Sequence, residues 1–136
     1  MRAVLDPNVI ISGLLSPNGS PARILLAFSR GEFELVASPA LLDELARALA
    51  YPKLRRRIAA DEAASVVAWL RRAATIAIDP SIAPAVRSAD PGDDYLLALA
   101  AAENTVLVSG DRHLLSLRRS APISSPAEFL ELLEEA

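Results

Sequence analysis

Four acidic residues occupy positions from which their carboxylates could converge on one site. They are Asp6, Glu44, Asp93 and Asp111. Converging carboxylates repel one another and require a cation, and oxygen ligands of this kind suit Mg²⁺, with Mn²⁺ as the alternative, rather than Zn²⁺. A carboxylate cage around a divalent metal is a common device for the attack of water on a phosphodiester. The set therefore indicates metal-assisted hydrolysis as the chemistry to consider.

Two of these acids follow aliphatic segments that predict strands. Asp6 comes directly after the strand expected at Arg2–Leu5, and Asp111 comes shortly after the strand expected at Thr105–Val108. Ligands of parallel α/β sheets bind outside the carboxyl ends of the strands, so this position favours a functional site. The alternative is structural, because an Asp at either position could cap the helix that follows it.

The other two acids belong to expected helices. Glu44 borders the apolar face of its helix, and its alternative is a surface ion pair with Arg47, which would contribute little to stability. Asp93 lies in the first turn of a later helix. Its alternative is that Asp90 is the N-cap and that Asp93 and Asp94 merely complement the helix dipole.

The elements that must position these acids alternate between strands and helices. Strands are expected at Arg2–Leu5, Phe33–Ala37, Thr75–Ile78 and Thr105–Val108, with a short edge strand at Ile123. Helices are expected at Val9–Leu15, Pro21–Ser29 with Ser20 as N-cap, Pro39–Ala50 with Ser38 as N-cap, Lys53–Ala59, Asp61–Ala74, Pro91–Glu103, Arg112–Leu117 and Pro126–Glu135. This alternation predicts an α/β fold with a mostly parallel sheet flanked by helices. The segment Leu96–Ala102 is apolar on every side and should be deeply buried.

Composition limits the class of protein. The 136 residues suit a single domain, 1–136, and a hydrophobic fraction of 52% is enough for a core. The chain has no cysteine, which excludes disulfides and thiolate metal sites. The N-terminus does not resemble a signal peptide, and no apolar run approaches the ~20 residues that span a bilayer. We therefore expect a cytoplasmic protein with no membrane partner.

The basic residues gather in one region, although the formal net charge of −3 does not by itself indicate a nucleic-acid binder. The basic cluster comprises Lys53, Arg55, Arg56, Arg57, Arg71 and Arg72. It could position a nucleic-acid backbone, or it could be a solvated helix face.

Five short motifs, in this order along the chain, resemble those of PIN domains of the VapC-like toxin group. They read V-L-D-P-N-V, S-P-A-L-L-D-E-L-A-R-A-L, D-P-G-D-D-Y-L-L-A-L-A, V-L-V-S-G-D-R-H-L-L and I-S-S-P-A-E-F-L. The resemblance implies a PIN-like domain with a sheet in the order 3-2-1-4-5. It also implies a ribonuclease that depends on Mg²⁺ or Mn²⁺ and leaves a 3′-hydroxyl and a 5′-phosphate.

The resemblance further implies roles for individual residues. The matching catalytic acids are Asp6, Glu44, Asp93 and Asp111, and the supporting residues are Asn8, Ser109 and Asp94. Asp6, Asp93 and Asp111 would hold the metal, while Glu44 would orient or deprotonate the attacking water. RNA would be the substrate, a cognate antitoxin protein the partner, and a homodimer the assembly.

The sequence departs from the family in two places, and two other functions stay open. Pro7 stands where the family has Thr or Ser, and His113, expected to be an exposed loop residue, stands where the family often has Asp. Pro7 supports a domain that has lost activity and only binds a partner. A receiver-like signalling domain would also gather acids around Mg²⁺, but it would carry a Lys after its last strand, and the one lysine, Lys53, lies elsewhere.

Overall fold

A five-stranded sheet forms the centre of the molecule in a computed structural model that describes residues 1–135. Its strands are β1 (Arg2–Leu5), β2 (Glu34–Ala37), β3 (Thr75–Ile76), β4 (Val106–Val108) and β5 (Ile123–Ser124). They lie in the order β3-β2-β1-β4-β5, and every neighbouring pair is parallel. The predicted fold class and the strand order implied by the PIN resemblance are both confirmed.

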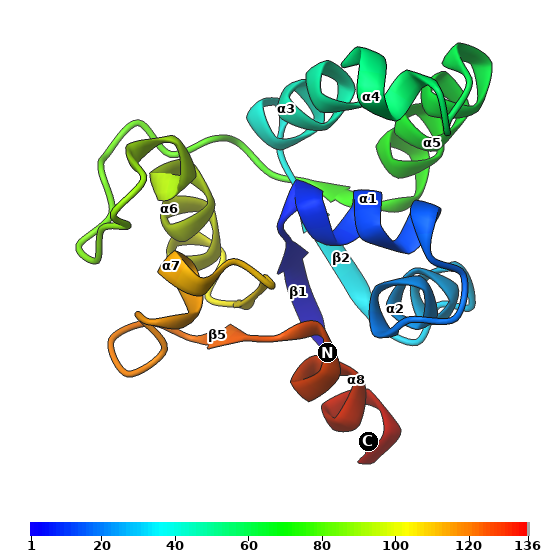
Figure 1. Ribbon diagram of the computed structural model, residues 1–136. Coiled ribbons are helices and arrows are strands. Elements are labelled where there is room, and N and C mark those ends of the chain that lie inside the picture. Colours follow the sequence, from blue (N-terminus) through cyan, green and yellow to red (C-terminus); the bar gives the residue numbers. More distant parts are fainter. Residues whose placement is uncertain (136) are drawn as a thin grey trace.

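Helices cover both sides of this sheet. They are α1 (Pro7–Leu15), α2 (Ser20–Ser29), α3 (Pro39–Leu49), α4 (Pro52–Arg55), α5 (Ala60–Ala73), the 3-10 turn η1 (Pro91–Asp93), α6 (Asp94–Ala102), α7 (Arg112–Leu115) and α8 (Pro126–Glu135). Figure 1 shows α6 and α7 on one side of β1, with α1 to α5 on the other. Within residues 1–135, no helix combines the length and the apolar character that crossing a bilayer requires.

Burial explains why the strands are aliphatic. Ala3, Val4 and Leu5 of β1 are all fully buried, because helices pack on both faces of a parallel sheet. Helix α6 is buried from Leu96 to Ala100, whereas Ala101 and Ala102 are exposed. The expectation of deep burial was therefore wrong for the last two residues of α6, Ala101 and Ala102.

Helix starts follow their capping residues, with some corrections. The Ser38 hydroxyl accepts the backbone N–H of Leu41 at 3.3 Å and caps α3, as predicted. The prediction of Ser20 as N-cap was wrong: α2 begins at Ser20, and Gly19 is its N-cap. This start places Pro21 inside the first turn, where a missing N–H costs nothing.

Two predicted helices differ in extent from the observed ones. The helix expected at Lys53–Ala59 begins one residue earlier and is shorter, at Pro52–Arg55. Pro52 ends α3 and also suits the first turn of a new helix, which explains the earlier start. The helix expected at Pro91–Glu103 is divided into η1 and α6. Asp90 is the N-cap of η1, and its Oδ1 accepts the N–H of Gly92 at 2.9 Å.

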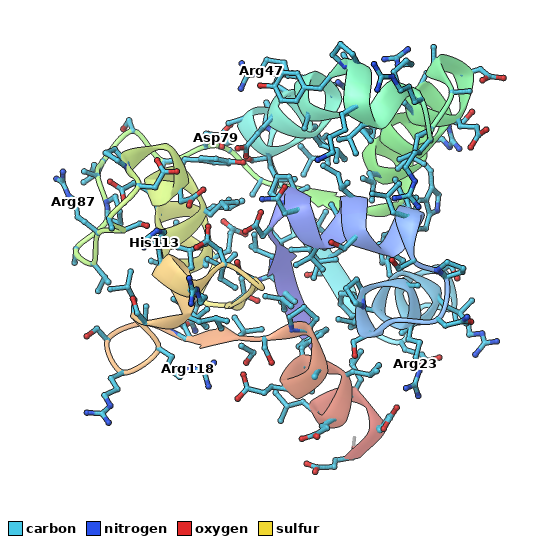
Figure 2. The ribbon with its side chains drawn as sticks, viewed as in Figure 1. Arg23, Arg47, Asp79, Arg87, His113 and Arg118 are labelled. Carbon is cyan, nitrogen blue, oxygen red and sulfur yellow. The ribbon has the colours of Figure 1, made fainter. Side chains whose placement is uncertain are left out.

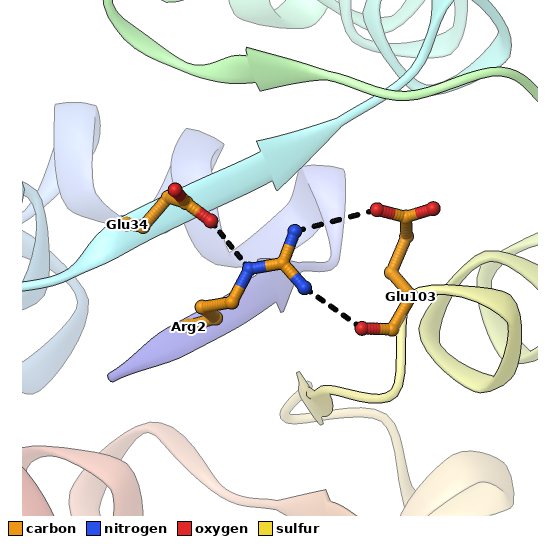
Figure 3. Close-up of polar contacts among 3 residues, drawn as sticks. All are labelled: Arg2, Glu34 and Glu103. Atoms are coloured by element: carbon orange, nitrogen blue, oxygen red, sulfur yellow. Dashed lines mark hydrogen bonds and ion pairs between the residues drawn. The ribbon is translucent and has the colours of Figure 1, made fainter.

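A charged network fastens the amino edge of the sheet, at the start of β1 and β2. The Arg2 guanidinium donates to the Glu34 carboxylate, and also to the Glu103 carbonyl at 2.8 Å and to Glu103 Oε1 at 3.3 Å (Figure 3). The hydrogen bond from Arg2 lowers the pKa of the Glu34 carboxyl. These side chains are partly exposed, so the network adds little to stability. Its main role is to hold β1, β2 and the end of α6 in position relative to one another.

Candidate active site

Asp6 sits at the carboxyl end of the central strand and is held from several directions. The residue is only 4% exposed. Oδ1 accepts the backbone N–H of Asn8 at 3.0 Å, which caps α1, and Oδ2 accepts the hydroxyl of Ser109 at 2.8 Å. Burial raises the pKa of the Asp6 carboxyl, these two hydrogen bonds oppose that rise, and the charges of Glu44 and Asp111 add to it.

Ser109 joins the ends of β1 and β4. It is fully buried, it donates to Asp6, and its hydroxyl oxygen accepts the backbone N–H of Asp111 at 3.0 Å. Asp111 in turn caps α7 by accepting the N–H of His113 at 2.7 Å through Oδ1. His113 is exposed, as expected, but it lies in α7 and not in a loop. Asp6 and Asp111 thus cap helices and also lie in one electrostatic cluster, so the two interpretations of these acids are compatible.

Asp93 contributes a carboxylate with an unsatisfied oxygen. Its Oδ2 is buried and has no hydrogen-bond partner among the described residues. Burial is the largest cause that raises the pKa of the Asp93 carboxyl to about 6, and the charges of neighbouring acids add to it. Those neighbours are Asp6, Asp90, Asp111 and Glu44. In the folded structure, the four predicted acids therefore lie close enough for their charges to interact.

The Asp94 side chain bonds to the loop before α6 and not to the acids of the cluster. Its Oδ1 accepts the backbone N–H of Ser88 at 2.8 Å and ties the 81–90 loop to the start of α6. One step along a helix turns a side chain by ~100°, which separates Asp94 from the direction of Asp93.

Glu44 is paired across the site with a residue that the sequence did not single out. The Tyr95 hydroxyl donates to Glu44 Oε2 and bridges α3 and α6. Burial, followed by the bond to Glu44, raises the pKa of the Tyr95 phenol. Within residues 1–135 Glu44 forms no ion pair with Arg47, whose side chain lies on the outer side of α3 (Figure 2). A signal for Tyr95 was available: it is the aromatic residue in the turn that follows Asp93.

The carboxylate oxygens of the four acids are ligands of the kind that a hard divalent cation prefers, although they do not surround a preformed site. No three acids of residues 1–135 are arranged as a ready-made ligand group. Both carboxylate oxygens of Asp6, and one oxygen each of Glu44 and Asp111, already accept hydrogen bonds. Mg²⁺ commonly takes one or two carboxylates and keeps several waters, so an all-oxygen cluster with an unsatisfied Asp93 oxygen suits it.

The predicted basic residues lie outside this cluster. Lys53, Arg55, Arg56, Arg57, Arg71 and Arg72 are all exposed, on α4, on the turn after it and in the last turn of α5. Figure 1 shows α4 and α5 beyond the end of α3, away from α6 and α7. Arg57 also donates to the carbonyl of Leu15 at 3.4 Å, at the end of α1. The structure thus places them on a separate surface.

A parallel sheet in this order, with acids gathered at its carboxyl edge, defines a class of α/β domain. The PIN domain family model matches residues 2–113 of the chain. The chain therefore belongs to the PIN domain family. This membership excludes the receiver-like alternative.

Individual relatives agree with this placement. The chain is 26% identical to an uncharacterized protein of Methanocaldococcus jannaschii, over 99% of this chain and 93% of that protein. Its fold is similar to that of VapBC2 from Rickettsia felis, crystallised with a DNA fragment from their promoter, with a TM-score of 0.62, 15% identity and coverage of 92% and 98% of the two chains. It is also similar to a PilT N-terminus domain protein of Sulfolobus solfataricus, with a TM-score of 0.57, 16% identity and coverage of 100% and 96%.

Proposed function

We propose that this PIN domain is a metal-dependent endoribonuclease and the toxin of a toxin–antitoxin pair. The observation that carries the proposal is the buried oxygen of Asp93, which has no partner among the described residues and lies in a cluster with four other acids. Carboxylates gathered in this way are stable only with a cation or a shared proton. The PIN family match supports a nuclease.

In this proposal Asp6, Asp93 and Asp111 hold Mg²⁺, with Mn²⁺ as the alternative, directly or through water. The metal, when bound, supplies positive charge that polarises the phosphodiester and lowers the pKa of water. Glu44 accepts a proton from the attacking water through the carboxylate oxygen that Tyr95 does not occupy. Ser109 and the N–H of Asn8 keep Asp6 in place, and Asp94 secures the start of α6.

Pro7 does not weaken the proposal. It is buried at the first position of α1, where a backbone N–H would have no helical partner, so its ring removes no hydrogen bond from the helix. What is lost is only the hydroxyl that other family members carry there. The alternative of an inactive binding domain therefore gains no support from the fold at Pro7.

The similarity of the fold to that of Rickettsia felis VapBC2 supports an antitoxin partner. We expect RNA to approach over the basic cluster, an antitoxin protein to inhibit the enzyme, and two copies of the chain to form a dimer.

A cleavage assay tests the activity. The purified chain should cut single-stranded RNA with Mg²⁺ or Mn²⁺, lose the activity in a chelator and regain it on adding metal back. Cleavage that persists undiminished in excess chelator would rule out the metal mechanism.

A further inference from the structure

A cavity opens beside the acidic cluster, on the side of α1, α2 and α8. Its volume is about 390 Å³, which lies within the ~300–1,000 Å³ typical of small-molecule pockets. Asp111 forms part of its wall and belongs to the acidic cluster as well. The cavity therefore borders the proposed site of cleavage at Asp111.

The wall of the cavity combines uncharged polar groups with apolar ones. Asn8 and Ser12 are one helical turn apart on the same face of α1, and both are exposed. Opposite them lie Pro21 at the start of α2 and Pro126 at the start of α8. No Lys or Arg of the described residues lines the cavity, and Asp111 would repel a phosphate. This chemistry suits a sugar and a base rather than an anion.

The position of α2 fixes the shape of the cavity. A Cβ placed on Gly13 would come within 2.6 Å of Leu25 Cδ1 and 3.1 Å of the Pro21 backbone, so α1 and α2 approach each other closely at this glycine. Ser12 precedes that contact and faces the cavity. Ser12 therefore lies next to the point where α1 packs closely against α2.

We propose that this cavity is a subsite for the nucleoside that adjoins the cut phosphodiester in RNA. Ribose hydroxyls hydrogen-bond with Asn8 and Ser12, and the base packs against Pro21 and Pro126. A 2′-hydroxyl held in this way would let the protein distinguish RNA from DNA. The assignment rests on the proposed nuclease function and adds to it a place for one specific part of the substrate.

The test fills the cavity without touching the acids. Ser12→Leu places an apolar side chain in the cavity, and Ser65→Leu, at another exposed serine in the middle of α5, is the matched control. Thermal melting checks that both variants fold.

Two readouts are expected to change together. Ser12→Leu should raise KM for RNA cleavage about tenfold with little change in kcat, the pattern of a lost binding contact, whereas Ser65→Leu should not. In NMR titrations with millimolar adenosine, wild type should show shifts at residues lining the cavity, and Ser12→Leu should lose them.

The outcomes separate the subsite from the nuclease. If wild type cleaves RNA but Ser12→Leu keeps the same KM, or if adenosine perturbs no residue of the cavity, the subsite is wrong and the nuclease stands. If wild type binds adenosine, Ser12→Leu does not, and neither cleaves RNA, the cavity binds a nucleoside but the nuclease function, and with it the place of the cavity beside a cut bond, is wrong.

Discussion

The acids of the cluster differ in how their charge is compensated. Asp6 accepts hydrogen bonds on both carboxylate oxygens, and Asp111 accepts one from the chain that follows it. Asp93 has a buried oxygen that accepts none from the described residues. Since an unpaired buried charge is costly, Asp93 is the residue at which function most clearly opposes stability.

Replacing Asp93 with Asn should stabilise the metal-free protein at neutral pH. The pKa of the Asp93 carboxyl is about 6 in the native state, above its value in the unfolded chain, so the native state favours the protonated form. The destabilising charge is therefore fully present above pH ~6 and disappears as the pH falls toward ~4. We expect a rise in melting temperature of roughly 3 °C at pH 7.5 in a chelator, on the order of 1 kcal/mol after allowance for solvent screening.

Melting curves from pH 4 to 8 provide the check, with Asp94→Asn as the matched control. Asn at position 94 can still accept the Ser88 N–H and should leave the melting temperature unchanged. A gain for Asp93→Asn that is the same at pH 4.5 and pH 7.5 would contradict the assignment of its charge.

Tyr95 should act as a positioning residue for Glu44. Tyr95→Phe removes the hydroxyl that donates to Glu44 and leaves the ring in place. We expect kcat for RNA cleavage to fall about tenfold, with KM and the melting temperature nearly unchanged, because only the orientation of the proposed base is lost. Tyr51→Phe is the control, since Tyr51 is 64% exposed. Equal kcat values for the two variants would remove Tyr95 from the mechanism.

At the scale of elements, the sequence predicts best where a strand ends and a helix begins. Asp6, Ser38 and Asp111 each mark such a junction, and each lies where it was expected. Their positions follow from local patterns: an aliphatic run, then a capping residue.

Long-range pairing could not be predicted in the same way. Tyr95 and Glu44 are separated by 51 residues and meet only because α3 and α6 face each other across the carboxyl edge of the sheet. The directions of Asp93 and Asp94 depend on the division of the expected helix into η1 and α6, which periodicity did not show. The contribution of α2 and α8 to one cavity likewise requires the folded arrangement.

Ser109 joins two strand ends, and its removal should weaken that junction. Ser109→Ala leaves Asp6 Oδ2 without its donor in a buried site, at a cost of about 1–3 kcal/mol in the free energy of unfolding. Urea denaturation measures the change. Thr105→Val is the matched control, because the buried Thr105 hydroxyl has no partner among the described residues and its loss should cost little. Equal losses in the two variants would show that the Ser109 bridge contributes nothing specific.

At the scale of the whole molecule, the acidic cluster around Asp93 and the basic cluster occupy different regions. The acids gather at the carboxyl edge of the sheet, whereas the basic cluster lies on α4, its following turn and the end of α5. An acidic site repels phosphate, so a separate cationic surface is needed to hold the backbone of RNA.

Replacing Arg55, Arg56 and Arg57 together with Ala should weaken RNA binding and flatten its dependence on salt. Each lost contact to a single-stranded phosphate should reduce the salt slope by roughly 0.7. Affinity measured between low and moderate salt is the readout, with Mn²⁺ binding expected to stay unchanged. A variant lacking Arg30, Arg118 and Arg119 removes the same charge elsewhere. If both triple variants lose the same affinity, the effect is one of net charge and not of this surface.

The central claim is that the acidic cluster around Asp93 carries out metal-dependent hydrolysis of RNA. The most direct measurement compares RNA cleavage by wild type, Asp93→Asn and Asp94→Asn with Mg²⁺, at equal concentrations of folded protein. We predict that Asp93→Asn loses activity by about a hundredfold or more, because a metal-holding carboxylate is gone, while Asp94→Asn stays within a few-fold of wild type. Undiminished cleavage by Asp93→Asn, or a larger loss in Asp94→Asn, would contradict the account.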